Sequence, residues 1–156
     1  MEVIVLPGMQ LNNEFIAQSV DIITDGGQVA TEGLSQNLAR AHLVALALDE
    51  GQIVGVAAIK NQSRAYIKGV GDDAGYQPHA RARELGYVAV KKERRGEHIG
   101  SDLADKLLIG YDGPCFATTR TQRMKDILKK RGFEKVGKEW FGVGNKPGLL
   151  SLWVRG

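Results

Sequence analysis

The stretch of residues 84–101, ELGYVAVKKERRGEHIGS, joins an apolar strand to a basic turn and then to a helix. Gly96 and Gly100 allow the backbone to approach an anion closely, and Arg94 and Arg95 add positive charge. The first N–H groups of a helix point outward without carbonyl partners, and the helix dipole adds positive potential there. The pattern favours a turn that binds phosphate. An ordinary strand–helix turn with solvated arginines is the alternative.

Other residue types capable of chemistry are poorly placed for it. Cys115 lies within an apolar strand pattern, which predicts a buried structural thiol rather than a nucleophile. His42, His79 and His98 are far apart and lack metal-ligand spacing, so no metal site is predicted. The glycines of residues 69–75 have one residue too many for a dinucleotide fingerprint. Three aromatic residues are expected in the core or in hairpin packing: Trp140, Phe141 and Trp153.

Hydrophobic periodicity predicts the elements that must position the basic turn. Strands are expected at 2–6, 43–48, 53–59, 85–90, 114–118, 139–143 and 149–154, with a closing turn at 145–148. Helices are expected from Asn12 or Asn13 to about residue 25, and at 34–41, 99–109 and 122–131. Residues 60–83 lack clear periodicity and are interpreted as an extended loop or irregular strand. This mixed order indicates an α/β or α+β sheet covered by helices, with a right-handed parallel crossover from 85–90 to 114–118.

Length and composition set further bounds. A chain of 156 residues, 43% hydrophobic and 25% charged, is typical of one globular domain over residues 1–156. Its net charge of +3 is too small to indicate nucleic-acid binding. No apolar run reaches the roughly 18 residues of a membrane span, and the amino terminus lacks the pattern of a signal peptide. With a single cysteine, we expect a reducing, cytoplasmic location.

Two motifs resemble those of the GNAT superfamily of acetyl-CoA-dependent N-acetyltransferases. Residues 95–101, RGEHIGS, placed five residues after Val90, resemble motif A, in which Gln or Arg is followed by spaced glycines. Residues 116–119 (FATT), a helix, and then residues 131–137 (RGFEKVG) resemble motif B. The resemblance extends over nearly the whole chain. It implies a mixed, mostly antiparallel sheet of about seven strands, with one parallel splayed pair and about four flanking helices.

The resemblance also implies an activity and a set of site residues. The chain would transfer an acetyl group from acetyl-CoA to an amine, on a small molecule or a protein, by direct attack in a ternary complex. No metal is implied, and a homodimer is expected. The residues implied to bind the cosubstrate are Val88, Ala89 and Val90 for the pantetheine arm, Arg95, Gly96, Glu97, His98, Ile99, Gly100 and Ser101 for the pyrophosphate, and Thr121.

Glu84 occupies the position where several members of the superfamily place a general base. A protonated amine does not attack a thioester, so a group must accept its proton. A free glutamate, with a pKa near 4.3, is a weak base, but burial or a relaying water overcomes this. A surface charge at the start of a strand, or a salt-bridge partner, is the alternative. Residues ahead of Glu84 are expected to border the acceptor pocket or to lie in a solvated loop: Tyr66, Tyr76, His79, Arg81 and Arg83.

Three positions depart from the superfamily pattern. His98 replaces the middle glycine of motif A, and Thr121 replaces a common asparagine at the head of the motif B helix, which it can still cap. Leu128 stands where many members have the tyrosine that protonates the departing thiolate. These departures keep a second hypothesis open, a non-catalytic module that binds CoA or acetyl-CoA as a sensor.

Overall fold

The computed structural model describes residues 1–27, 31–144 and 146–156. Within these residues it has seven β-strands, five α-helices and two short 3₁₀ helices. The chain divides into two compact units, one made of Met1–Asn61 and Leu85–Asp112, the other of Gln62–Glu84 and Gly113–Gly156. The single domain expected over residues 1–156 stays a prediction.

The strands are hydrogen-bonded in the order β1-β2-β3-β4-β5-β7-β6. The pairs β1–β2, β2–β3, β5–β7 and β6–β7 are antiparallel. Strand β4 (Arg83–Val90) pairs in parallel with β5 (Cys115–Thr119), and this register covers only Arg83–Cys115 and Glu84–Phe116. The predicted sheet, mixed and mostly antiparallel with one parallel pair, is therefore confirmed.

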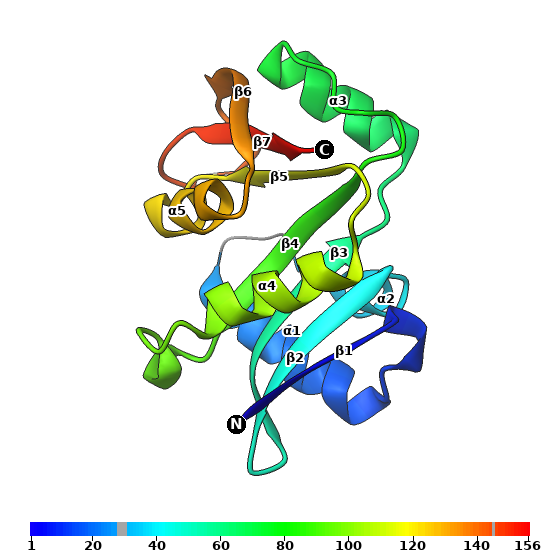
Figure 1. Cartoon of the computed structure of the whole chain (residues 1–156), viewed down its shortest axis with the longest axis vertical. Helices are drawn as coiled ribbons and strands as arrows, with labels where there is room; N and C mark the ends of the chain where they lie inside the picture. Colours follow the sequence, from blue (N-terminus) through cyan, green and yellow to red (C-terminus); the bar gives the residue numbers. More distant parts are fainter. Residues whose placement is uncertain (28–30, 145) are drawn as a thin grey trace. The chain divides into compact units, whose positions relative to one another are not determined.

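The first unit builds its sheet from β1 (Glu2–Leu6), β2 (Leu43–Asp49), β3 (Gln52–Lys60) and most of β4. Helices α1 (Asn13–Gly26) and α2 (Leu34–Ala39) cover one face, and α4 (Ile99–Gly110) covers the other (Figure 1). A side chain at Gly55 would meet Ile99 and Leu103 of α4 at 2.9 and 3.1 Å, whereas the adjacent Val56 belongs to the core beneath α1. Burial on both faces explains why β2 and β3 are continuous apolar runs.

The second unit contains β5, α5 (Gln122–Lys130), β6 (Glu134–Trp140), β7 (Leu150–Arg155) and α3 (Arg64–Ala74). Helix α3 packs on one face of the strands, where Phe116 and Leu152 are fully buried. Alternate residues of β7, such as Trp153, point to the opposite face. Glu84, which pairs with Phe116, lies on this same face beneath α3.

Helix α3 corrects the prediction of an extended loop at 60–83, and it makes five helices where about four were expected. Ser63 caps the helix by accepting a hydrogen bond from the Tyr66 backbone N–H at 3.1 Å, and Gly75 ends it in the left-handed conformation. The buried residues Ile67, Val70, Gly71 and Ala74 lie on one helical face. The glycines and aspartates of this segment weakened its hydrophobic periodicity, although the serine cap and the terminal glycine were visible signals.

The end of the chain needs two smaller corrections. Strand β6 spans Glu134–Trp140 rather than 139–143, and Phe141 is 85% exposed rather than packed. Trp140 packs against the second unit's core, and Trp153 is buried, as expected. Asn145 of the predicted closing turn lies outside the described residues.

Candidate active site

The turn after β4, residues 91–98, is held by one arginine. Arg94 donates a hydrogen bond to Asp49 at 2.7 Å and two to Glu97 at 2.8 and 3.1 Å. It therefore ties the turn to the end of β2. Arg94 was predicted to supply charge to an anion, but its side chain is engaged in shaping the turn.

The same contacts shift the pKa values of the pair. Hydrogen bonding to Glu97, and then to Asp49, raises the pKa of Arg94 above its usual value. Hydrogen bonding to Arg94 lowers the pKa of Glu97. A lowered carboxyl pKa contributes stability above the unfolded-state value, and the contribution is lost as pH falls through the folded-state value. Both groups of the Arg94–Glu97 pair are thus charged at neutral pH.

The remaining turn residues form the amino end of α4. Gly96 has φ = +89° and His98 has φ = +62°, both left-handed, and His98 makes no side-chain cap. At this end, the Asp102 N–H donates a hydrogen bond to the His98 carbonyl at 3.1 Å. In general, the first N–H groups of a helix point outward and can donate to an anion. The Arg95 Nε donates to the Val90 carbonyl at 3.4 Å, so its guanidinium lies at the end of β4.

Strand β4 is distorted just before this turn. Tyr87 has φ = +55°, a conformation that costs a non-glycine residue about 1 kcal/mol or more. Its ring is buried, and the Lys60 Nζ lies 4.1 Å from the ring centroid, in cation–π range. A left-handed residue inside a strand disrupts the hydrogen-bond ladder locally.

Glu84 lies at the other end of β4, in the second unit. It is only 3% exposed, which excludes the alternative of a surface carboxylate. Its Oε1 accepts a hydrogen bond from the Gln62 Nε2 at 2.8 Å, and its Oε2 accepts one from the Tyr66 hydroxyl at 3.3 Å. Tyr66 itself is 40% exposed, so its phenol links the buried carboxylate to the surface.

Two positions on the motif B helix have structural roles, while cosubstrate binding by Thr121 stays a prediction. The Thr121 Oγ1 caps α5 by accepting from the Met124 N–H at 3.3 Å. The predicted cap is confirmed, and the hydroxyl is engaged in it. Leu128 is fully buried, so this position packs the core and supplies no acid.

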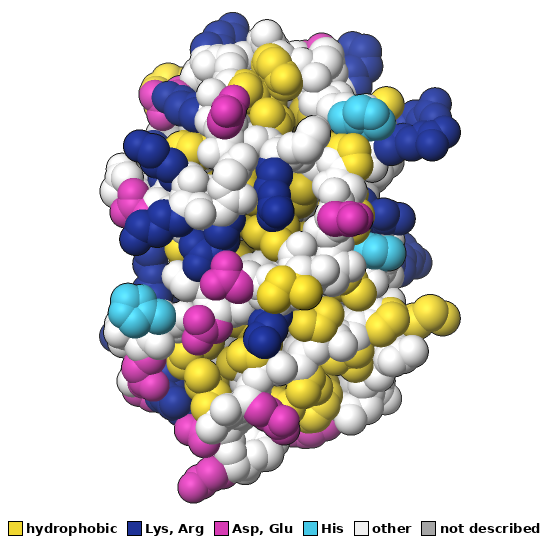
Figure 2. Space-filling view, viewed as in Figure 1, with side chains coloured by type: hydrophobic (Ala, Val, Ile, Leu, Met, Phe, Trp, Pro, Cys, Tyr) yellow, Lys and Arg dark blue, Asp and Glu magenta, His cyan; other side chains and the backbone are white. Residues whose placement is uncertain are grey.

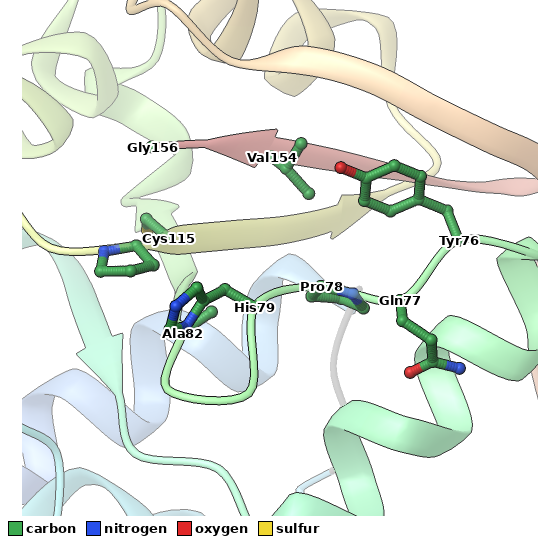
Figure 3. A pocket seen from close by; sticks show the side chains of 9 residues that line it. Tyr76, Gln77, Pro78, His79, Ala82, Cys115, Val154 and Gly156 are labelled. Atoms are coloured by element: carbon green, nitrogen blue, oxygen red, sulfur yellow. The ribbon is translucent and has the colours of Figure 1, made fainter.

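The residues expected to border an acceptor pocket separate into two groups. Tyr66 contacts Glu84, whereas Tyr76 and His79 line a hollow of about 290 Å³ beside the start of β5. In Figure 3 the Tyr76 ring lies over Val154 of β7, and His79 lies next to the start of β5. Cys115 lines this hollow but is buried, as predicted.

Wider features of the chain restrict other functions. Among the described residues, no group of three or more His, Cys, Asp or Glu side chains is arranged to hold a metal ion. Nor does any described helix combine the length and apolarity needed to cross a membrane. On the face shown in Figure 2, acidic side chains lie among the basic ones.

The left-handed conformation of His98 explains the glycine of the superfamily pattern and leads to a stability prediction. His98→Gly should change the free energy of unfolding by less than about 1 kcal/mol, because relief of strain offsets the extra freedom of glycine when unfolded. His98→Val should lower it by about 1–2 kcal/mol, since a branched residue fits this region worst. Urea denaturation measures both. A valine variant as stable as the parent would contradict this conformation.

Comparison with known proteins gives a consistent fold. No family model matches the sequence, and no curated protein matches it. Escherichia coli ElaA is 16% identical, with a TM-score of 0.73 and 99% of each chain covered. A Pseudomonas aeruginosa acyl-CoA N-acyltransferase is 13% identical, with a TM-score of 0.72 and the same coverage. A GNAT-family acetyltransferase from Streptococcus pneumoniae is 15% identical, with a TM-score of 0.66 and 99% of each chain covered. At these identities the likeness establishes the fold alone.

Proposed function

We propose that this chain, which has the fold of the GNAT acetyltransferases, transfers an acetyl group from acetyl-CoA to an amine. The observation that carries the proposal is the arrangement of strand β4. One end of β4 presents a buried carboxylate, Glu84, and the other leads through a distorted backbone into the uncapped amino end of α4. A proton acceptor and an anion-binding turn on one strand are the two groups that such a transfer requires.

The turn fits the diphosphate of a CoA thioester. Positive φ values at Gly96 and His98 turn the chain into the helix, and the helix supplies outward N–H groups with a positive dipole. Arg95 adds a guanidinium at the end of β4. The ion pairs of Arg94 with Asp49 and Glu97 fix the turn before any ligand arrives. This lowers the entropy cost of ordering the turn on binding. Glu97 is neutralised by the same arginine, so its charge opposes an anion less.

The remaining predicted residues would bind the other parts of acetyl-CoA. Backbone groups of Val88, Ala89 and Val90 would bond the pantetheine arm, and the amides from Gly96 to Ser101 would bond the diphosphate. Ile99 and Gly100 are buried within the first unit. Acetyl-CoA, when bound, supplies the acetyl thioester. The Val88 N–H beside the distorted Tyr87 would donate to its carbonyl oxygen, where negative charge develops.

Glu84 would accept the proton of the incoming amine, directly or through a water. Gln62 and Tyr66 hold its two oxygens in place. The amine then attacks the thioester directly, since the only cysteine is buried and is not a nucleophile. With Leu128 in the core, no tyrosine at that position protonates the departing thiolate, and we propose that solvent supplies this proton. The homodimer and the cytoplasmic location stay predictions.

A second function is favoured by specific observations. The buried Leu128 and the histidine at the head of α4 favour a module that holds CoA or acetyl-CoA without turnover. Both functions require the anion-binding turn, but only the first consumes the thioester. One experiment on binding and one on thiol release therefore separate them.

Thermal unfolding with excess ligand tests the shared requirement. Acetyl-CoA and CoA at 100 times their Kd should each add about 2.7 kcal/mol, raising the Tm by roughly 5–10 °C. Pantetheine, which lacks the diphosphate, should raise it much less. Release of free thiol in the presence of a panel of amines then identifies the enzyme.

Variants locate the binding in the turn. Arg95→Gln should weaken acetyl-CoA binding about tenfold, as expected for one charged contact. Lys106→Gln removes an equal charge from the exposed face of α4 and should leave binding unchanged. Absence of a Tm shift with both nucleotides would refute the enzyme and the binding module alike. Tight binding without thiol release over the amine panel would favour the module.

A further inference from the structure

Arg120 is a half-buried cationic residue that the proposed reaction does not use. It follows the last residue of β5 and precedes Thr121, the cap of α5. Its Nε is buried and, within the described part of the chain, has no hydrogen-bond partner. None of the ion pairs formed in the second unit, Lys68–Asp72, Lys125–Glu139 and Lys135–Glu139, includes it. A buried guanidinium N–H without an acceptor is costly and uncommon.

The fold holds this guanidinium in one place. Arg120 Nη2 and Cζ lie against Gly142, at the position a Cβ atom would occupy, and the Leu150 side chain lies beside them. Glycine at residue 142 is therefore a requirement for the arginine's position. The residues after β6 thus cover the guanidinium from one side.

Strand register places Arg120 on the same face as Glu84. Glu84 pairs with Phe116, and paired residues in a sheet share a face. Every second residue of an extended chain points to the same face, so Phe116, Thr118 and Arg120 share one face. On this face Phe116 is buried beneath α3. Arg120 follows the end of β5 and is four residue steps beyond Phe116, or roughly 13 Å if the chain stays extended. Half-buried Thr118 lies between them.

We infer that Arg120 binds an anionic group, a carboxylate or a phosphate, on the amine acceptor. The Nε–H of arginine forms one edge of a donor pair that matches two oxygens of such an anion. A bound oxyanion would satisfy the buried Nε, which an aliphatic or cationic acceptor would not. The inference rests on the proposed function and narrows the acceptor class to amines that carry a negative group, with the amine directed toward Glu84.

Paired acceptors test this specificity. The carboxylate series glycine, 4-aminobutyrate and 6-aminohexanoate is compared with the corresponding amides, and O-phosphoethanolamine with ethanolamine, in an assay of thiol release from acetyl-CoA. At least one anionic acceptor should have a kcat/KM tenfold or more above its neutral partner, mainly through KM. Whether a carboxylate or a phosphate shows the larger preference identifies the anion.

Variants assign the preference to this residue. Arg120→Gln and Gly142→Ala should both abolish it, the second by displacing the guanidinium without removing its charge, and Arg120→Lys should retain only part of it. Arg123→Gln removes an exposed arginine from α5 in the same unit and should leave the preference intact. Should Arg120→Gln fail to fold, the other variants still decide the question.

Direct binding keeps this inference separate from the proposed function. In protein labelled with 15Nε-arginine, the resonance missing from Arg120→Lys belongs to Arg120. It should shift on addition of 6-aminohexanoate or O-phosphoethanolamine and not on addition of their neutral partners. An unmoved resonance, or equal use of charged and neutral acceptors, would overturn the inference. Loss of acetyl-CoA binding would instead overturn the proposed function, whatever this resonance does.

Discussion

Replacing Glu84 by glutamine is expected to slow acetyl transfer by a factor of about 10²–10⁴, the usual contribution of a positioned general base. Glutamine has nearly the same shape, so the buried site keeps its packing while it loses the proton acceptor. The deficit should be largest at low pH, where the amine is most protonated and most needs a base. Rates measured from pH 6 to 9, with acetyl-CoA affinity measured in parallel, check this expectation.

Affinity for acetyl-CoA should be almost unchanged in Glu84→Gln, because the turn at residues 91–98 does not use this carboxylate. Tyr66→Phe removes one of the two hydrogen bonds to Glu84 and should slow the reaction several-fold without abolishing its pH dependence. Glu134→Gln, at an exposed position on β6, is the matched control. A Glu84→Gln variant with the parent's pH–rate profile would exclude Glu84 as the base.

The parts of the fold that could be predicted from the sequence are those with strong local patterns. The hairpin of β2 and β3 has two β-rich apolar runs around Asp49-Glu50-Gly51, and Glu50 and Gly51 take the positive φ values that a tight turn needs. Helix α4 ends within one residue of its predicted boundary. In both places periodicity and turn chemistry agree, so local sequence was sufficient.

Helix α3 could not be predicted in the same way, because its stability depends on tertiary packing. Its buried face includes Gly71 and Ala74, which contribute little hydrophobic signal. Gly71 is there because the Gln77 side chain occupies the space of a Cβ atom. A contact of this kind joins residues that a periodicity search treats as unrelated, and the helix was therefore interpreted as a loop.

In the candidate site, too, the residues close together in sequence could be predicted, and those brought together by tertiary structure could not. The turn that we propose to bind the diphosphate is local in sequence, and its residues were predicted from their types and from the resemblance to motif A. The partners of Glu84 could not, because Gln62 and Tyr66 come from a segment whose helix was not predicted. Arg120 was also missed. Its significance comes from the burial of Nε and from Gly142, and neither is visible in a sequence in which the arginine resembles any solvated base.

Gly137, the last residue of the segment that resembles motif B, is expected to be the most sensitive glycine of the second unit. It has φ = +68°, it lies where the β6–β7 register shifts, and a Cβ atom there would collide with the Ala74 carbonyl at the end of α3. Gly137→Ala should lower the free energy of unfolding by roughly 3 kcal/mol or more, the strain of left-handed alanine plus a backbone clash. Urea or thermal denaturation measures the loss.

Alanine substitutions at two other glycines separate the conformational strain of Gly137→Ala from its backbone clash. Gly132 has φ = +84° with open space around it, so Gly132→Ala should cost only the conformational strain, about 1–2 kcal/mol. Gly69 lies in α3 with open space and ordinary φ, so Gly69→Ala should stabilise by about 0.5–1 kcal/mol. If Gly137→Ala cost no more than Gly132→Ala, the close approach of β6 to the end of α3 would be wrong. If it costs more, the excess measures how firmly β6 holds the helix that carries Tyr66, and acetyl transfer should fall with it as Glu84 loses that partner.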